Sequence, residues 1–141
     1  MTAQPESGQQ EEQDLPTIDF ASPMPGFPQH HQFVLVSLDD EGLLYALTSL
    51  RDPEVRFLVA PPAPFFPDYA PEIPQESADL LGVTDAGQVL LLLVITAGET
   101  AGQSTANLLA PILIDQANRR ALQVVLTGSG LPVQAELMAV A

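Results

Sequence analysis

Thr105-Ala-Asn-Leu-Leu-Ala-Pro-Ile-Leu-Ile-Asp115 is an apolar run that carries one amide, Asn107, near its start and one proline, Pro111, inside it. Proline cannot donate to a β-ladder and is therefore confined to edge strands or bulges. A buried asparagine must find hydrogen-bond partners or cost stability. Together the two residues predict a strand with an exposed, irregular edge, where a partner polypeptide can add or dock. The pattern therefore favours a binding protein over an enzyme.

Further strands are expected along the chain, separated by turn signals. Residues 88–96 are apolar on both faces, which is typical of a central strand. A short helix is predicted over residues 75–81, because Pro74 stands just before it and Gly82 just after it. The expected strands cover residues 17–20, 33–38, 43–47, 55–60, 88–96, 107–115 and 121–126, with a last short one near 131–137. This spacing predicts an all-β, mainly antiparallel, small β-barrel-like domain with one short helix and long proline-rich loops.

Two proline-rich loops, residues 23–28 and 61–71, carry aromatic rings. Prolines restrict the freedom of the second loop, so Phe65, Phe66 and Tyr69 are displayed rigidly. Rigid display lowers the entropy lost on association, which suits an interface anchor. The alternative, in which these rings cap the barrel core, stays open, as it does for the ring in the first loop. Both loops are expected to pack across the open end of the barrel.

The charge of the chain is strongly negative. Its 141 residues include 18 acidic residues, four arginines and no lysine, for a net charge of −14. Such a chain repels phosphate backbones, which argues against direct binding to nucleic acid or to an anionic membrane. An acidic surface instead attracts basic partners over a long range. The alternative, in which the acidity serves only to keep the protein in solution, stays open.

The chain is long enough for one domain. Residues 1–16 are polar, acidic and poor in apolar side chains, so we expect a disordered acidic tail there and a β-barrel domain over residues 17–141. The N-terminus lacks the basic and apolar regions of a secretory signal. The longest apolar run, residues 89–95, is too short for a membrane helix. A cytoplasmic protein is therefore expected.

Signatures of catalysis are missing from the sequence. The histidines, His30 and His31, are neighbours and would point to opposite faces of an extended strand, so they do not predict a metal site. Cysteine is absent, and no nucleophile-elbow or phosphate-loop motif is present. We therefore expect no catalytic, cofactor-binding or metal-binding residues. A small-ligand-binding barrel closed by the proline loops remains the alternative.

Six sequence elements, taken in order, resemble those of the flagellar assembly factor FliW family. Two of them weigh most, Phe65-Phe-Pro-Asp-Tyr69 and Thr105-Ala-Asn-Leu-Leu-Ala-Pro111. The full set is Pro25-Gly-Phe27, Phe33 to Val36, Asp52-Pro53 ahead of Val55-Arg-Phe57, Pro64 to Tyr69, Thr105 to Pro111, and Arg119-Arg120 ahead of Gln123 to Leu126. These elements span nearly all of the expected domain.

The resemblance implies a small β-barrel-like regulator of flagellin production. Proteins of this kind bind the RNA-binding translational repressor CsrA and stop it from silencing flagellin mRNA, and they also bind flagellin. An acidic protein is suited to attract a basic repressor. The candidate partner-binding residues are Phe27, Phe65, Phe66, Asp68, Tyr69, Asn107 and Pro111.

Overall fold

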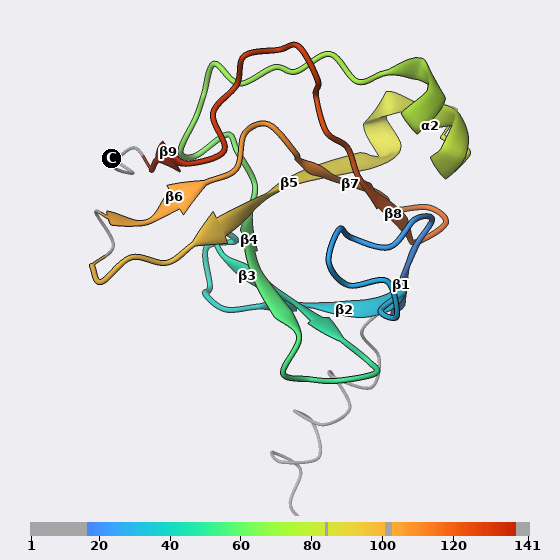
Figure 1. Cartoon of the computed structure of the whole chain (residues 1–141), viewed down its shortest axis with the longest axis horizontal. Coiled ribbons are helices and arrows are strands. Elements are labelled where there is room, and N and C mark those ends of the chain that lie inside the picture. The colour runs from blue at the N-terminus through green and yellow to red at the C-terminus, as the bar shows by residue number, and fades with distance from the viewer. Residues whose placement is uncertain (1–16, 84, 101–102, 138–141) are drawn as a thin grey trace, which may run out of the picture.

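The computed structural model of the chain describes residues 17–83, 85–100 and 103–137. The predicted acidic tail, residues 1–16, lies outside the described residues. The elements in chain order are β1 (Thr17–Phe20), β2 (Gln32–Ser37), β3 (Tyr45–Ser49), β4 (Arg56–Ala60), α2 (Gln75–Leu81), the 3-10 helix η1 (Ala86–Gln88), β5 (Val89–Thr96), β6 (Thr105–Ala106), β7 (Ile112–Asp115), β8 (Arg120–Gln123) and β9 (Ala135–Glu136). Figure 1 shows α2 at one side of the molecule and the short strands β6 and β9 at the other.

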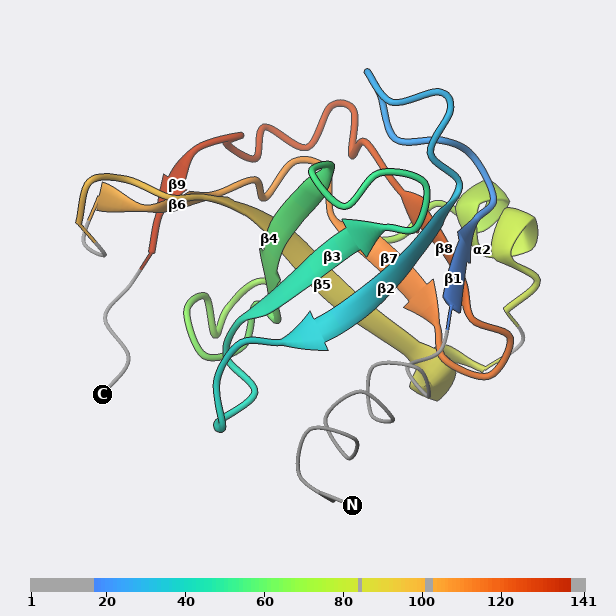
Figure 2. The same cartoon turned by 90° about the horizontal axis from the view of Figure 1, so that it is seen from below.

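Seven strands close into a barrel, in the order β4-β3-β2-β1-β8-β7-β5 with β5 paired back onto β4 (Figure 2). β1 and β8 run parallel and the other neighbours run antiparallel. The predicted all-β, mainly antiparallel fold is therefore confirmed, with one parallel pair that makes the barrel mixed. β6 and β9 extend the sheet beyond β5.

β5 is the central strand that the sequence predicts. One side of β5 pairs with β4, and the other pairs with β7 near its start and with β6 near its end. Leu90, Leu92 and Val94 pack into the barrel interior, whereas Leu93 and Ile95 pack on the outer face. Both faces of this strand are thus covered, which explains its continuous apolar sequence.

The β2–β3 hairpin forms at the predicted turn, but its second strand starts later than expected. The carboxylate of Asp39 accepts hydrogen bonds from the backbone N–H of Leu43 at 3.1 Å and of Leu44 at 3.4 Å. These contacts hold both residues in the turn. β3 consequently runs from Tyr45 to Ser49 instead of over residues 43–47.

The predicted strand over residues 107–115 is broken. β7 begins only at Ile112, and residues 107–111 form a kink between β6 and β7. In this kink the side-chain oxygen of Asn107 accepts hydrogen bonds from the N–H of Leu109 at 3.0 Å and of Ala110 at 3.1 Å. The expected irregularity is thus present. The expected exposure is wrong, because Pro111 is fully buried and its carbonyl accepts a hydrogen bond from Val124 at 2.9 Å.

The barrel interior is filled by side chains. Its buried members are Ile18, Phe20, Met24, Phe33, Leu47, Val59, Leu92, Ile112, Ile114 and Ala121. A ligand-binding barrel needs a deep apolar cavity, so this filled interior removes the support for that alternative. Among the described residues, none of the helical segments has the length and apolarity that crossing a bilayer requires.

Two further apolar clusters lie on the outer face of the barrel. One is centred on Leu93 and Ile95 and is covered by the second proline-rich loop. The other lies under α2, whose Leu81 is almost fully buried. The expectation that both proline loops cross the open end of the barrel is therefore wrong for residues 61–71, which pack on the outer face.

α2 matches the predicted helix at both ends. Pro74 precedes it, and Gly82 ends it in the left-handed conformation with φ of 74°. The N–H of Gly82 donates to the carbonyl of Asp79 at 3.1 Å, and that of Val83 donates to Ala78 at 3.1 Å. This αL termination satisfies carbonyls that the helix end would otherwise leave free.

Candidate functional site

The second proline-rich loop folds through two short backbone turns. The carbonyl of Pro62 accepts hydrogen bonds from the N–H of Phe65 at 3.0 Å and of Phe66 at 2.6 Å. The carbonyl of Phe66 in turn accepts one from the N–H of Tyr69 at 3.0 Å. Because the loop's prolines fix φ as well, the three aromatic rings are held at defined places on the outer face.

Tyr69 fastens this loop to the kink at residues 107–111. Its hydroxyl donates a 2.7 Å hydrogen bond to the carbonyl of Leu108, and its ring packs on the outer cluster around Leu93. Burial disfavours the charged phenolate and raises the pKa of Tyr69 to about 12. The structure thus brings together the two sequence elements that weighed most in the family resemblance.

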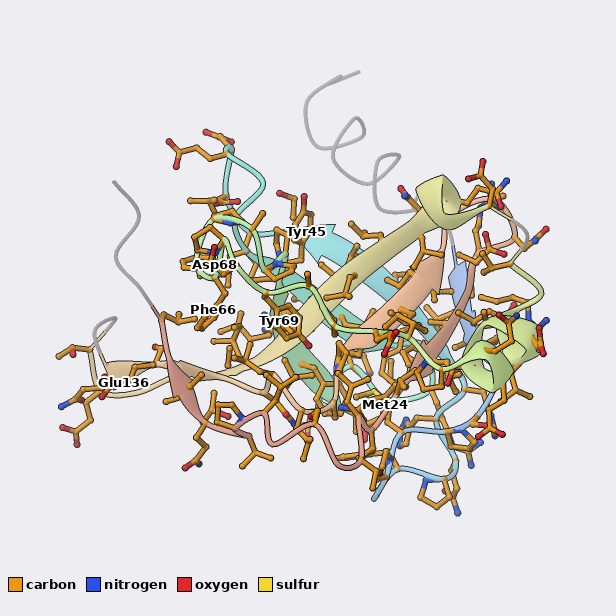
Figure 3. The ribbon with its side chains drawn as sticks, turned by 90° about the horizontal axis from the view of Figure 1, so that it is seen from above. Met24, Tyr45, Phe66, Asp68, Tyr69 and Glu136 are labelled. Atoms are coloured by element: carbon orange, nitrogen blue, oxygen red, sulfur yellow. The ribbon has the colours of Figure 1, made fainter. Side chains whose placement is uncertain are left out.

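An apolar groove of about 260 Å³ opens between the loop and the kink. We call it the aromatic groove; it is lined by Phe66, Pro67, Asp68, Tyr69, Leu108 and Leu131. Figure 3 shows Phe66, Asp68 and Tyr69 together on one part of the molecule, with Met24 of the first proline loop well apart from them. Half-buried rings beside one exposed carboxylate suit an apolar side chain that stands next to a basic one.

The predicted site residues fall into two groups. Phe65, Phe66, Asp68, Tyr69 and Asn107 all belong to the proline loop or to the kink that it packs on. The three rings do not cap the barrel core, which was one of the two interpretations from the sequence; they cover the outer cluster instead and stay partly exposed. Their contact with a partner stays a prediction.

The other two candidates lie elsewhere. Pro111 is fully buried, so its ring is closed off from a partner in this structure. Phe27 belongs to the first proline loop, where its ring stands perpendicular to Phe57 with centroids 5.1 Å apart and also contacts His30. A partner contact through Phe27 remains a prediction, but its ring already has a structural role.

Sequence reasoning missed three residues of the aromatic groove, Pro67, Leu108 and Leu131. The N–H of Leu108 donates to the carbonyl of Pro132 at 3.0 Å, so the segment before β9 lies against the kink. The glycines at 128 and 130 indicate a turn there. Nothing local in the sequence shows that this turn returns to the kink.

Several polar side chains of the described residues serve local structure. His30 shares a 2.7 Å hydrogen bond with the hydroxyl of Ser49, while His31 is exposed. The buried carboxylate of Asp115 accepts from the N–H of Ala117 and from the side chain of Asn118. Within residues 17–83, 85–100 and 103–137, no three histidine or acidic side chains gather closely enough to hold a metal ion. The aromatic groove is therefore the feature best suited to function.

Comparisons with known proteins give one consistent result. The family model described as "FliW protein" matches residues 2–137 of the chain. A flagellar assembly factor FliW of Syntrophomonas wolfei is 36% identical over 119 residues, which cover 84% of this chain and 75% of the relative. That of Bacillus subtilis is 35% identical over 122 residues, covering 86% and 85%. The crystal structure of a flagellar assembly factor FliW superposes with a TM-score of 0.82 at 30% identity, covering 87% of this chain and 86% of the other.

Proposed function

The chain belongs to the FliW family of flagellar assembly factors, and we propose that it works by binding two proteins in turn. The first is the RNA-binding translational repressor CsrA, whose silencing of flagellin mRNA it would antagonise. The second is flagellin. Free flagellin would displace the repressor, so that synthesis follows assembly. We propose this as a non-catalytic role carried out in the cytoplasm.

The observation that carries the proposal is the aromatic groove with Asp68 at its edge. Large aromatic rings are the residues most often found as energetic anchors of protein interfaces. Phe66 and Tyr69 are held in place before binding by the turns of their loop and by the Tyr69 hydroxyl, so little further ordering is required. The groove is therefore built for an interface in which two rings contribute much of the affinity.

Charge supports a basic partner. The chain carries a net charge of −14, and a protein that binds RNA presents basic surface to the phosphates. Attraction between such surfaces speeds diffusional encounter and disfavours acidic competitors. The repressor has the required chemistry, and the acidic chain has no need to imitate RNA in detail.

The test uses the full chain together with CsrA and flagellin encoded in the same genome. We expect Phe66→Ala to weaken binding of a partner by about 1–2 kcal/mol, because it removes an anchor ring. Leu50→Ala is the control, since Leu50 is a large apolar residue at the surface that lies in the β3–β4 turn and not in the aromatic groove. Affinities from calorimetry, read beside melting temperatures, separate a lost anchor from lost stability.

Two results would contradict the proposal. One is an absence of complex with either protein at micromolar concentrations. The other is equal affinity of the wild type and Phe66→Ala for both proteins. Electrostatic steering has its own readout, because the association rate should fall as salt rises. An association rate that stays constant from low to high salt would contradict electrostatic steering.

A further inference from the structure

A second groove lies between α2 and the outer face of the barrel and shares no lining residue with the aromatic groove. Figure 1 shows α2 on the side of the molecule opposite β6 and β9. The groove has a volume of about 440 Å³. Val89 and Leu91 of β5 and Leu113 of β7 form its floor, and Ala78, Leu81 and Val83 form its wall. We call it the α2 groove. Its size lies in the range of ligand-binding pockets, and its lining is largely apolar.

The groove exists because α2 is short and presents a small side chain to it. α2 has seven residues, of which Ser77 and Leu81 are buried against the barrel. Ala78 comes one residue after Ser77, on the flank of the helix that faces the groove. Its single methyl group leaves open the space that a longer side chain at this position would fill.

The segment that carries the wall of the groove is acidic. The segment 72–85 contains Glu72, Glu76, Asp79 and Asp85 and no basic residue. Asp85 lines the groove itself, and its carboxylate is oriented by a 2.9 Å hydrogen bond from the N–H of Gly87. Asp79 accepts a 2.9 Å hydrogen bond from the side chain of Gln75, another lining residue. Both carboxylates are exposed, so they can attract a cation to the edge of the apolar groove, with an attraction that weakens as salt rises.

We propose that the α2 groove docks a segment of a partner polypeptide in which aliphatic side chains alternate with lysine or arginine. The aliphatic groups would enter the groove, and the cations would face Asp79 and Asp85. A second copy of this chain is a poorer occupant, since a symmetric interface would place the same carboxylates against each other. Charge complementarity therefore selects a cationic segment.

The α2 groove is separate from the aromatic groove but lies on the same outer side of β5. Leu91 forms part of its floor and also packs against both outer clusters. Residues 71–74 connect the proline loop to α2. A partner held at one groove therefore has a second contact within reach along the outer face. The inference does not depend on the identity of the partners proposed above.

The experiment titrates the ¹⁵N-labelled full chain with a synthetic amphipathic peptide of leucine and lysine. We expect the largest amide shifts in residues 73–83, 89–91 and 113. Ala78→Gln fills the groove with a polar side chain and should weaken peptide binding about tenfold. Asp85→Asn keeps the oxygen that bonds Gly87 but removes the charge, and should weaken it about threefold.

The matched control is Leu80→Ser. Leu80 is 53% exposed, and it lies about 200° around the helix from Ala78, so this substitution should leave the affinity unchanged. Three outcomes would overturn the proposal. The first is that the amide shifts map outside the groove. The second is that both groove variants bind the peptide as tightly as the wild type. The third is that the groove amides shift with protein concentration alone, which would identify a second copy of the chain as the occupant. A control peptide with glutamate in place of lysine should not bind.

Discussion

The two proline-rich loops look alike in sequence and do different work in the structure. Each contains phenylalanine close to several prolines, in residues 23–28 and 61–71. The first places Met24, which is 4% exposed, in the barrel interior and packs Phe27 against Phe57. The second lies on the outer face and leaves its rings half exposed around a groove.

The difference comes from the elements that each loop connects. The first loop joins β1 to β2, which are neighbours in the barrel wall, so its apolar side chains can enter the interior. The second joins β4 to α2, which lies outside the barrel, so its rings pack on the outer cluster around Leu93 and Ile95. Proline and aromatic content thus predicts a rigid loop, while the topology determines whether its rings enter the barrel interior or cover the outer face.

Replacing Met24 should give the largest effect and would show that the first loop serves stability. Met24→Ala removes a buried side chain and leaves a cavity, which should lower the free energy of unfolding by about 2–5 kcal/mol. Urea unfolding measures this change as a lower midpoint at unchanged slope. Affinity for a partner should stay the same where the variant is folded. A variant of normal stability and weakened binding would reverse the assignment of the two loops.

Phe27→Ala tests the same loop at a less buried position. Its ring is half-buried and edge-on to Phe57, so we expect a loss of about 1–3 kcal/mol, less than for a fully buried phenylalanine. The free energy of unfolding should fall while partner affinity is kept, the opposite of Phe66→Ala. Loss of affinity without loss of stability would instead identify Phe27 as a partner-binding residue. The first loop would then have the same role as that proposed for the second.

Elements with local signals were the ones that the sequence predicted well. Pro74 and Gly82 mark both ends of α2, because proline suits a helix start and glycine adopts the left-handed φ at its end. β5 was recognised as central from its apolar residues on both faces. The irregularity after Asn107 was also predictable, because Pro111 has no N–H to donate to a regular ladder and a buried Asn107 needs hydrogen-bond partners.

Features that depend on pairing between residues far apart in the chain could not be predicted from the sequence. The kink was expected to be exposed, yet Val124 and Leu126 bond to its carbonyls from the segment after β8. The parallel pairing of β1 with β8 was also missed, because an extended strand has the same alternation in either direction. Only the proline-loop side of the aromatic groove was predicted. Leu131 reaches the groove through a turn, and no local sequence signal shows that this turn brings the chain back to the kink.

Tyr69→Phe measures how firmly the second loop is fastened to the kink. The substitution keeps the ring and removes the hydroxyl that donates to the carbonyl of Leu108. We expect a loss of about 0.5–1.5 kcal/mol in the free energy of unfolding, the usual net worth of one hydrogen bond. Hydrogen exchange should rise at Leu109 and Ala110, whose amides lie in the kink. Unchanged exchange there would mean that the loop is held by its rings alone.

The smallest expected effect is a fall in the free energy of unfolding at alkaline pH, caused by Tyr69 of the second loop. The first loop cannot cause it, because it has no ionisable residue between Pro23 and Pro28. Burial raises the pKa of Tyr69 to about 12 in the folded chain, whereas an unfolded tyrosine has a pKa of about 10. Between these values the folded state holds more protons than the unfolded state, so stability falls as pH rises; below the lower value the contribution is fully present. Tyr69→Phe lacks this group and should lose less stability than the wild type between about pH 10 and about pH 12. Urea midpoints of both proteins across this range measure the difference, and parallel pH profiles would show that the Tyr69 hydroxyl is not sheltered by the kink.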